Sequence, residues 1–211
     1  MRKFYTGTMK RPVWVVFDVG GVIFDYQKAF TDIATYLEVE KEKISEKIAS
    51  YRGDSERGGK LFDEILRETL KDIKKEHEYE KVYDLWWDVE KFLVGTKDVI
   101  IDLQKAGYKL AFFTNNWEGM HEKVLETLPQ LGMIDMLFES SREGFIKPEK
   151  AFYQLVEQKT GASGWDIYFI DDVKANIAAA QELGWQTFLY ELGKDGGESA
   201  NRKIREILLD I

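Results

Sequence analysis

The stretch VVFDVGGVIFD, residues 15–25, joins a short apolar run to a turn. The run begins one residue earlier, and its four apolar residues WVVF (14–17) predict a buried strand. The glycine pair Gly20-Gly21 predicts that the chain turns directly afterwards. Asp18 therefore stands at the carboxyl end of the first predicted strand.

The second half of the chain alternates between apolar runs and helical patterns. The predicted strands are 108–114, 134–140, 166–171 and 185–190. The predicted helices are 96–107, 116–128, 148–161, 173–184 and 201–210, and Pro148 is expected in the first turn of the third. Strands that alternate with helices of about a dozen residues form a parallel sheet with right-handed crossovers. The predicted fold is a doubly wound, Rossmann-like α/β sheet.

Residues 27–94 have a different pattern, because Glu, Lys, Leu and Ile recur there at helical spacing and proline is absent. The segment RGDSERGG (52–59) breaks the pattern, and KVYDLWWDVEKFL (81–93) predicts a further amphipathic helix. We expect a helical insert of three or four helices at 27–94, within an α/β core formed by 1–26 and 95–211.

Composition restricts the class of protein. With 211 residues, 44% of them hydrophobic, the chain can bury one core and a sizeable insertion. The absence of cysteine excludes disulfides and thiolate metal sites and favours a cytoplasmic location. Neither a signal peptide nor a membrane-spanning run is predicted. A net charge of −8 argues against duplex nucleic acid as a partner. The expected partner is a small anionic molecule, bound by a monomer or a homodimer.

Polar side chains gather where the predicted strands end. Asp18 follows the first strand, TNN (114–116) ends the next, and the pair DD (171–172) ends another. Lys147 precedes Pro148, and a residue before proline has an extended backbone from which its side chain can reach across a site. Because ligands of such folds bind at the carboxyl ends of the strands, these four segments are predicted to form one site.

Four motifs in this order, FDVGGVIFD, FFTNN, FIKPE and FIDDVKANIAAAQELGW, resemble those of the haloacid dehalogenase (HAD) superfamily. The resemblance covers nearly the whole chain, and the helical insert stands where that family places a cap. The motifs TNNW, KPE and IDDxxxN are most similar to those of sugar-phosphate phosphatases of the glucose-1-phosphate type and of the phosphatase domain of soluble epoxide hydrolases. The resemblance implies an Mg²⁺-dependent phosphatase of small phosphate monoesters.

The resemblance also implies roles for individual residues. Asp18 would be the nucleophile that forms an aspartyl-phosphate. Asp18, the carbonyl of Gly20 and the carboxylate of Asp172 would bind Mg²⁺, which prefers oxygen ligands. Asp171 would hold a metal-bound water or Lys147. The expected metal residues are thus Asp18, Gly20, Asp171 and Asp172.

The remaining expected residues would bind the phosphate or the rest of the substrate. Thr114 and the amide of Asn115 would bind phosphate oxygens, and Lys147 would neutralise both the nucleophile and the phosphate. Asn176 would orient Asp172 or a substrate oxygen. Two readings stay open for Arg52 and Arg57 in the 52–59 loop: they close over the substrate, or they contact only solvent and nearby glutamates.

Charge balance supports the metal. Three aspartates and a phosphate dianion would carry about five negative charges against the single positive charge of Lys147. Two like charges about 4 Å apart repel by roughly 4 kcal/mol at an effective dielectric near 20. A divalent cation would remove most of this repulsion, so we expect Mg²⁺ to be required.

Gly20 departs from the family pattern, which in most phosphatases has an aspartate there that protonates the leaving oxygen. Such an acid contributes roughly 10²–10⁴-fold to the rate. Three outcomes are open: a substrate with a good leaving group, a substitute acid from the cap or from Asp25, or a slow protein that mainly binds phosphometabolites. We favour the first. A 2-haloacid dehalogenase is a weaker alternative, because those enzymes use no metal and lack the adjacent aspartates of the fourth motif.

Several other residues have structural expectations. Asn116 is expected to cap a helix, and His77 and His121 lack the spacing of a metal site or a triad. Trp117 and one of Trp86 and Trp87 are candidates for the wall of the cleft.

Overall fold

A five-stranded parallel sheet forms the centre of the molecule and confirms the predicted α/β fold. The computed structural model describes residues 12–88, 94–119, 121, 122, 126 and 134–211. The strands are β1 (Trp14–Phe17), β2 (Lys109–Thr114), β3 (Met136–Glu139), β4 (Ile167–Asp171) and β5 (Gln186–Leu189). Their order in the sheet is β3-β2-β1-β4-β5, and the pairings are all parallel.

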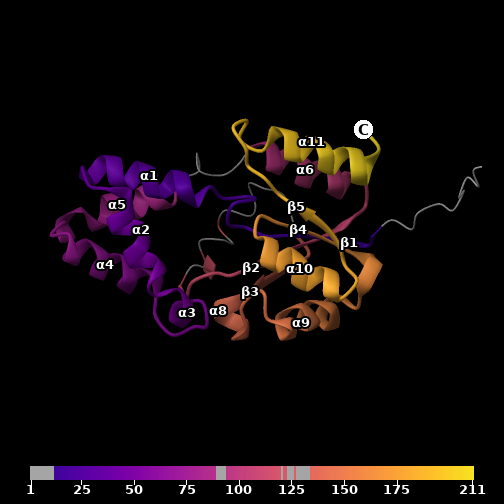
Figure 1. The fold of residues 1–211 in the computed structure, drawn as a ribbon, viewed down its shortest axis with the longest axis horizontal. Coiled ribbons are helices and arrows are strands. Elements are labelled where there is room, and N and C mark those ends of the chain that lie inside the picture. The colour runs from indigo at the N-terminus through magenta and orange to yellow at the C-terminus, as the bar shows by residue number, and fades with distance from the viewer. Residues whose placement is uncertain (1–11, 89–93, 120, 123–125, 127–133) are drawn as a thin grey trace, which may run out of the picture.

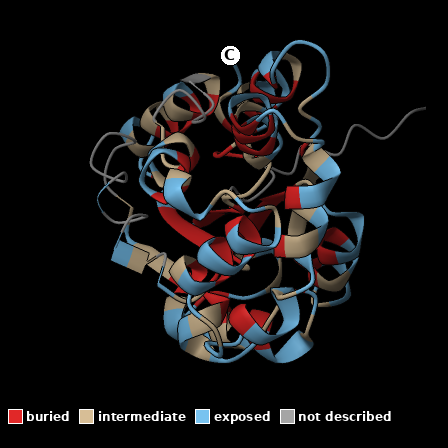
Figure 2. Ribbon diagram, turned by 90° about the vertical axis from the view of Figure 1, so that its left-hand side faces the viewer, coloured by how far each residue is buried: buried red, intermediate tan, exposed pale blue. Residues whose placement is uncertain are grey.

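Helices cover both faces of this sheet (Figure 1). On one face lie α6 (Val94–Lys105) and α11 (Glu198–Leu209); on the other lie α9 (Lys150–Thr160) and α10 (Lys174–Glu182). Side chains alternate between the faces, so Val15 and Phe17 pack with α6 and α11, whereas Val16 packs on the opposite face. Figure 2 shows the consequence: buried strands lie between helices whose outer surfaces are exposed. Two short helices, α8 (Ser140–Glu143) and the 3-10 helix η3 (Gly164–Asp166), flank β3 and β4.

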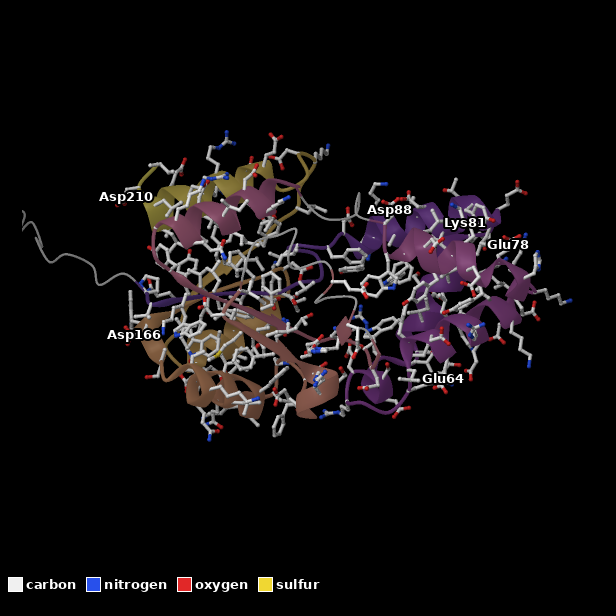
Figure 3. The ribbon with its side chains drawn as sticks, turned by 180° about the vertical axis from the view of Figure 1, so that it is seen from behind. Glu64, Glu78, Lys81, Asp88, Asp166 and Asp210 are labelled. Atoms are coloured by element: carbon white, nitrogen blue, oxygen red, sulfur yellow. The ribbon has the colours of Figure 1, made fainter. Side chains whose placement is uncertain are left out.

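The segment between β1 and α6 forms a helical lobe beyond the carboxyl ends of the strands (Figure 1). Its helices are α1 (Tyr26–Leu37), α2 (Lys41–Ala49), α3 (Arg52–Ser55), α4 (Phe62–Asp72), the 3-10 helix η1 (Glu76–Glu78) and α5 (Tyr79–Trp86). Their apolar faces build a separate core that includes Ile33, Leu66 and Val82. Glu64 and Lys81 lie on the outside of this lobe (Figure 3).

The described elements differ from the predicted ones in a few places. The helix predicted at 81–93 begins earlier, at Tyr79, and α5 ends at Trp86; residues 89–93 lie outside the described residues. The helix predicted at 116–128 does not begin at 116, because residues 116–119 form a loop; residues 120, 123–125, 127 and 128 lie outside the described residues. Pro148 is not in the first turn of α9, because Glu149 is the N-cap and the helix starts at Lys150. The domain limits 27 and 94 stay predictions, since the described helical lobe extends from Tyr26 to Trp86.

The strand register brings the ends of the strands together. Phe17 pairs with Phe112 on β2 and with Ile170 on β4. The Asp18 amide then donates to the Ile170 carbonyl (2.8 Å), so Asp18 leaves the sheet next to Asp171. This edge of the sheet faces the helical lobe (Figure 1). Among the described helices, none combines the length and the apolar character needed to cross a membrane.

Candidate active site

A cavity of about 390 Å³ lies where the carboxyl edge of the sheet meets the helical lobe. The sheet side of its wall is polar and includes Asp18, Gly20, Thr114, Asn115, Lys147 and Asp172. The lobe side is mainly aromatic and includes Phe24, Phe30, Trp86 and Trp87, together with the charged residues Arg52 and Glu56. The cavity thus combines a charged floor with an apolar roof.

Asp18 is held by the turn that follows β1. Its Oδ1 accepts the Val19 amide (2.7 Å), and the Val19 carbonyl accepts the amides of Ile23 (2.9 Å) and Phe24 (2.8 Å), which closes the turn. Gly21 has a φ of 79°, in the left-handed region, and a Cβ there would lie 2.2 Å from Asp172 Oδ2. Only glycine therefore lets the turn pass this close to the second carboxylate.

The Lys147 ammonium is buried, and it has an acceptor for each of its three protons. Nζ donates to Asp171 Oδ2 (2.7 Å) and to the Phe113 carbonyl (2.8 Å), and it lies 3.0 Å from Asp18 Oδ1. Burial by itself lowers the pKa of Lys147, but the facing carboxylates of Asp18 and Asp171 outweigh it and raise the pKa above its ordinary value. Lys147 is therefore a permanent positive charge beside Asp18.

Asp171 is fully buried and surrounded by donors. Its Oδ1 accepts the Val173 amide (2.7 Å), and Asn176 Nδ2 lies 3.1 and 3.0 Å from its two oxygens. Lys147 is a further donor to Asp171, so the Asp171 carboxylate holds the side chains of Lys147 and Asn176 in place. Asn176 was expected to orient Asp172 or a substrate oxygen. Its amide donates to Asp171 and not to Asp172, which corrects the first alternative; Asn176 also lines the cavity, and the second alternative stays a prediction.

Three carboxylates meet at this point without matching positive charge. Asp18, Asp171 and Asp172 each offer an oxygen, and these oxygens lie within 4.8 Å of one another. Burial raises the pKa of Asp18 to about 7; Lys147 opposes the rise, and Asp171 and Asp172 add to it. Burial, with repulsion from Asp171, raises the pKa of Asp172 to about 6. Oxygen donors crowded in this way fit a hard divalent cation such as Mg²⁺.

The loop after β2 is tied to the segment that carries Lys147. Asn115 Nδ2 donates to the Lys147 carbonyl (3.0 Å), and the Lys147 amide donates to Asn115 Oδ1 (2.8 Å). The side chain of Asn115 is thus engaged with the backbone of Lys147. Asn115 and the buried Thr114 both line the cavity. Asn116 donates to Glu139 (2.6 Å) and accepts from the Trp117 amide (2.9 Å), so it braces the loop against β3.

The structure separates the two arginines of the 52–59 loop. Arg52 lines the cavity, with its Nε 3.8 Å from Glu56 Oε1. Arg57 is not brought there: its guanidinium forms an ion pair with Glu149 and donates to the Gly144 carbonyl (3.3 Å). The prediction that Arg57 contacts substrate is therefore corrected, because Arg57 fastens the loop to the outside of the α/β core.

Glu56 is a cavity residue that sequence reasoning did not single out. It is 6% exposed, although Arg52 and Arg57 on either side of it are exposed. Burial raises the pKa of Glu56, while Arg52 and a hydrogen bond from the Trp117 indole lower it. The sequence offers one signal for Glu56, which is an acidic residue between Arg52 and Arg57. The burial of Glu56 depends on contacts with a loop that is distant in the sequence.

The aromatic wall is wider than predicted, because both Trp86 and Trp87 line the cavity along with Trp117. Trp86 lies 4.9 Å from Phe62 and 5.2 Å from Phe30 between ring centroids. Within the described part of the chain, the buried indole N–H groups of Trp86 and Trp87 have no hydrogen-bond partner. His77 and His121 pair with Glu78 and Glu139, as structural residues would.

The fold places the protein in the Rossmann-like α/β class, with its candidate site at the carboxyl edge of the sheet. Residues 14–184 match the model of the haloacid dehalogenase-like hydrolases, and the chain belongs to that family. It is 32% identical over 91 residues to bifunctional epoxide hydrolase 2 of Rattus norvegicus, a match that covers 41% of this chain and 16% of that protein. The chain thus spans a small part of this relative.

Two further comparisons extend over most of the chain. The D-ribitol-5-phosphate phosphatase of Bacteroides thetaiotaomicron is 25% identical over 198 residues, which cover 86% of this chain and 93% of the relative. The structure of a HAD family enzyme from the same organism, in complex with magnesium and inorganic phosphate, has a TM-score of 0.66 at 18% identity. This match covers 87% of this chain and 96% of that one, and it shows a shared fold.

Proposed function

We propose that this protein is an Mg²⁺-dependent phosphatase of small phosphate monoesters that works through an aspartyl-phosphate on Asp18. The observation that carries the proposal is the meeting of three carboxylates and one buried ammonium at the floor of the cavity, where Asp18, Lys147 and Asp172 line its wall and Asp171 lies behind them. Family membership and the phosphatases among the relatives support it.

The proposed cation ligands are the carboxylates of Asp18 and Asp172 and the carbonyl of Gly20. The raised pKa values of Asp18 (about 7) and Asp172 (about 6) support a cation, because the protein alone does not compensate their charge. When bound, Mg²⁺ would neutralise negative charge on the carboxylates and on the phosphate. The magnesium and phosphate in the structural relative are consistent with this assignment.

The protein's own groups then divide the reaction between them. The free carboxylate oxygen of Asp18 attacks phosphorus, the bond to the leaving oxygen breaks, and water later attacks the aspartyl-phosphate to release phosphate. Lys147 and Thr114 bind oxygens of the transferred group together with the Asn115 amide. Asp171, itself held by Asn176, keeps Lys147 directed at Asp18.

The roof of the cavity points to the kind of leaving group. The rings of Phe30, Trp86 and Trp87 offer an apolar surface, and the guanidinium group of Arg52 at the same wall offers donors. A sugar ring has both an apolar face and acceptor oxygens, so sugar phosphates fit this combination. Arg52 at the same wall would bind an acidic or hydroxyl group of the substrate.

Gly20 is the observation that favours a second candidate, a slow protein that binds phosphometabolites. A panel of sugar and other phosphate monoesters with Mg²⁺ distinguishes the two. The phosphatase predicts steady phosphate release that is abolished by EDTA and by Asp18→Asn. Binding of phosphometabolites without turnover, or release that survives Asp18→Asn, would refute the proposed function.

A further inference from the structure

We propose that Glu56, on the helical insert, is the proton donor and acceptor that position 20 lacks. The inference rests on the proposed function and assigns one more catalytic residue to the same cavity. In the first step the Glu56 carboxyl would protonate the leaving oxygen, and in the second the Glu56 carboxylate would take a proton from water.

The position of Glu56 supports this role. It lines the cavity that contains Asp18 and Lys147, and its side chain is 8% exposed. A leaving group points away from the nucleophile in an in-line displacement. Glu56 belongs to the lobe that closes the cavity opposite the sheet, so it is on the side where the leaving oxygen would lie.

The segment that carries Glu56 is also held in place by the α/β core. Trp117 follows directly on the 114–116 segment, lines the same cavity and lowers the pKa of the Glu56 carboxyl. The backbone on either side is docked to the same loop: the Glu118 amide donates to Ser55 O (3.3 Å), and the Phe62 amide donates to Glu118 O (2.8 Å). Glu56 is therefore positioned by the loop that directly follows Thr114 at the end of β2.

The direction in which the pKa of Glu56 is shifted fits a general acid–base group. Burial raises the pKa of Glu56, and three cations oppose the rise: Arg52 most strongly, then Lys147 and Arg57. A carboxyl whose pKa moves toward neutrality can donate a proton at one step and accept one at the next. A permanently ionised surface glutamate could do only the second.

Asp25 is the other acid near the turn, but it is engaged elsewhere. Its Oδ1 accepts the Lys28 amide (2.9 Å) as the N-cap of α1. In the described part of the chain it does not line the cavity. Glu56 is thus the better candidate for a substitute acid.

The proposed steps balance. In the first, the Asp18 oxygen–phosphorus bond forms, the bond from phosphorus to the leaving oxygen breaks, and the Glu56 proton moves to that oxygen. In the second, water attacks phosphorus, its proton returns to Glu56, and the bond from phosphorus to Asp18 breaks. Phosphate and alcohol leave, and both carboxyl groups return to their starting states.

The test compares 4-nitrophenyl phosphate, whose leaving group needs no proton, with glucose 6-phosphate, whose alkoxide does. We expect Glu56→Gln to lower kcat/KM for glucose 6-phosphate by roughly 10²–10⁴-fold, and for 4-nitrophenyl phosphate by less than about tenfold. Adding Gly20→Asp to Glu56→Gln should restore glucose 6-phosphate hydrolysis. The Cβ atom that an aspartate adds at position 20 causes no clash, because it would lie 3.7 Å from Tyr26 Cδ1.

Equal losses for both substrates, or no loss, would overturn the role of Glu56. The single variant Gly20→Asp gives an answer even if Glu56→Gln does not fold: a gain below about tenfold for glucose 6-phosphate supports an acid already present, and a gain of roughly 10²-fold or more contradicts it. A wild-type protein that releases phosphate from no ester of the wider panel would instead refute the proposed function itself.

Discussion

At the scale of single residues, Gly21 packs so closely against the carboxylate of Asp172 that no side chain fits between them. Gly21→Ala would force a methyl group to within 2.2 Å of Asp172 Oδ2 at a φ of 79°. We expect the variant to lose Mg²⁺ binding along with roughly 1–2 kcal/mol of stability from the left-handed backbone. Isothermal titration with Mg²⁺ and chemical denaturation measure the two effects.

Gly161→Ala is the matched control for Gly21→Ala. Gly161 has a φ of 68°, and a Cβ there meets nothing within 4 Å. This control should therefore show the backbone cost alone, with Mg²⁺ binding unchanged. Equal Mg²⁺ affinities in the two alanine variants would contradict the role of Gly21.

The crowded carboxylates also predict how Mg²⁺ binding depends on pH. Because the pKa values of Asp18 and Asp172 are raised to about 7 and about 6, the metal-free folded protein keeps protons that the unfolded chain has lost above pH 4. These groups therefore destabilise the metal-free fold progressively as pH rises from about 4 to about 7. Mg²⁺ needs the ionised forms, so its stabilising effect should be largest above pH 7 and nearly absent at pH 5.

Thermal unfolding with Mg²⁺ and with EDTA, repeated from pH 5 to pH 8, measures this difference. At a hundred times its dissociation constant, a ligand stabilises by about 2.7 kcal/mol. Asp172→Asn should remove the Mg²⁺ increment at every pH. An increment that does not change between pH 5 and pH 8 would count against these two carboxylates as ligands.

At the scale of elements, the 52–59 segment, which begins with α3, carries two arginines with different surroundings. Arg57 pairs with Glu149 on the surface, where both side chains are about 40% exposed, so Arg57→Gln should leave the stability nearly unchanged and change kcat/KM less than twofold. Arg52 lines the cavity, so Arg52→Gln should raise KM at least several-fold. Steady-state kinetics with one sugar phosphate compares them, and a larger KM effect from Arg57→Gln would reverse our assignment.

At the scale of the whole molecule, local patterns predicted the sheet edge and the helical insert, but not which residues of the insert face that edge. Asp18, Thr114 and Asp171 end buried parallel strands, and strand ends of a doubly wound sheet meet by topology. Strand periodicity and family motifs were therefore sufficient to place them together.

The residues that sequence reasoning misplaced depend on contacts between distant segments. Arg57 turned out to face Glu149, 92 residues away, and Glu56 is buried because Ser55 and Phe62 dock on the loop at Glu118. The amide of Asn176 could reach either acidic neighbour, and only the geometry of α10 assigns it to Asp171. No local pattern carries this information.

The most direct measurement is mass spectrometry of the protein quenched with acid during turnover of a sugar phosphate in the presence of Mg²⁺. Our account predicts one phosphoryl group on the peptide that contains Asp18, absent in Asp18→Asn and in EDTA. Continued phosphate release with no modified Asp18, or a phosphoryl group on another residue, would contradict it.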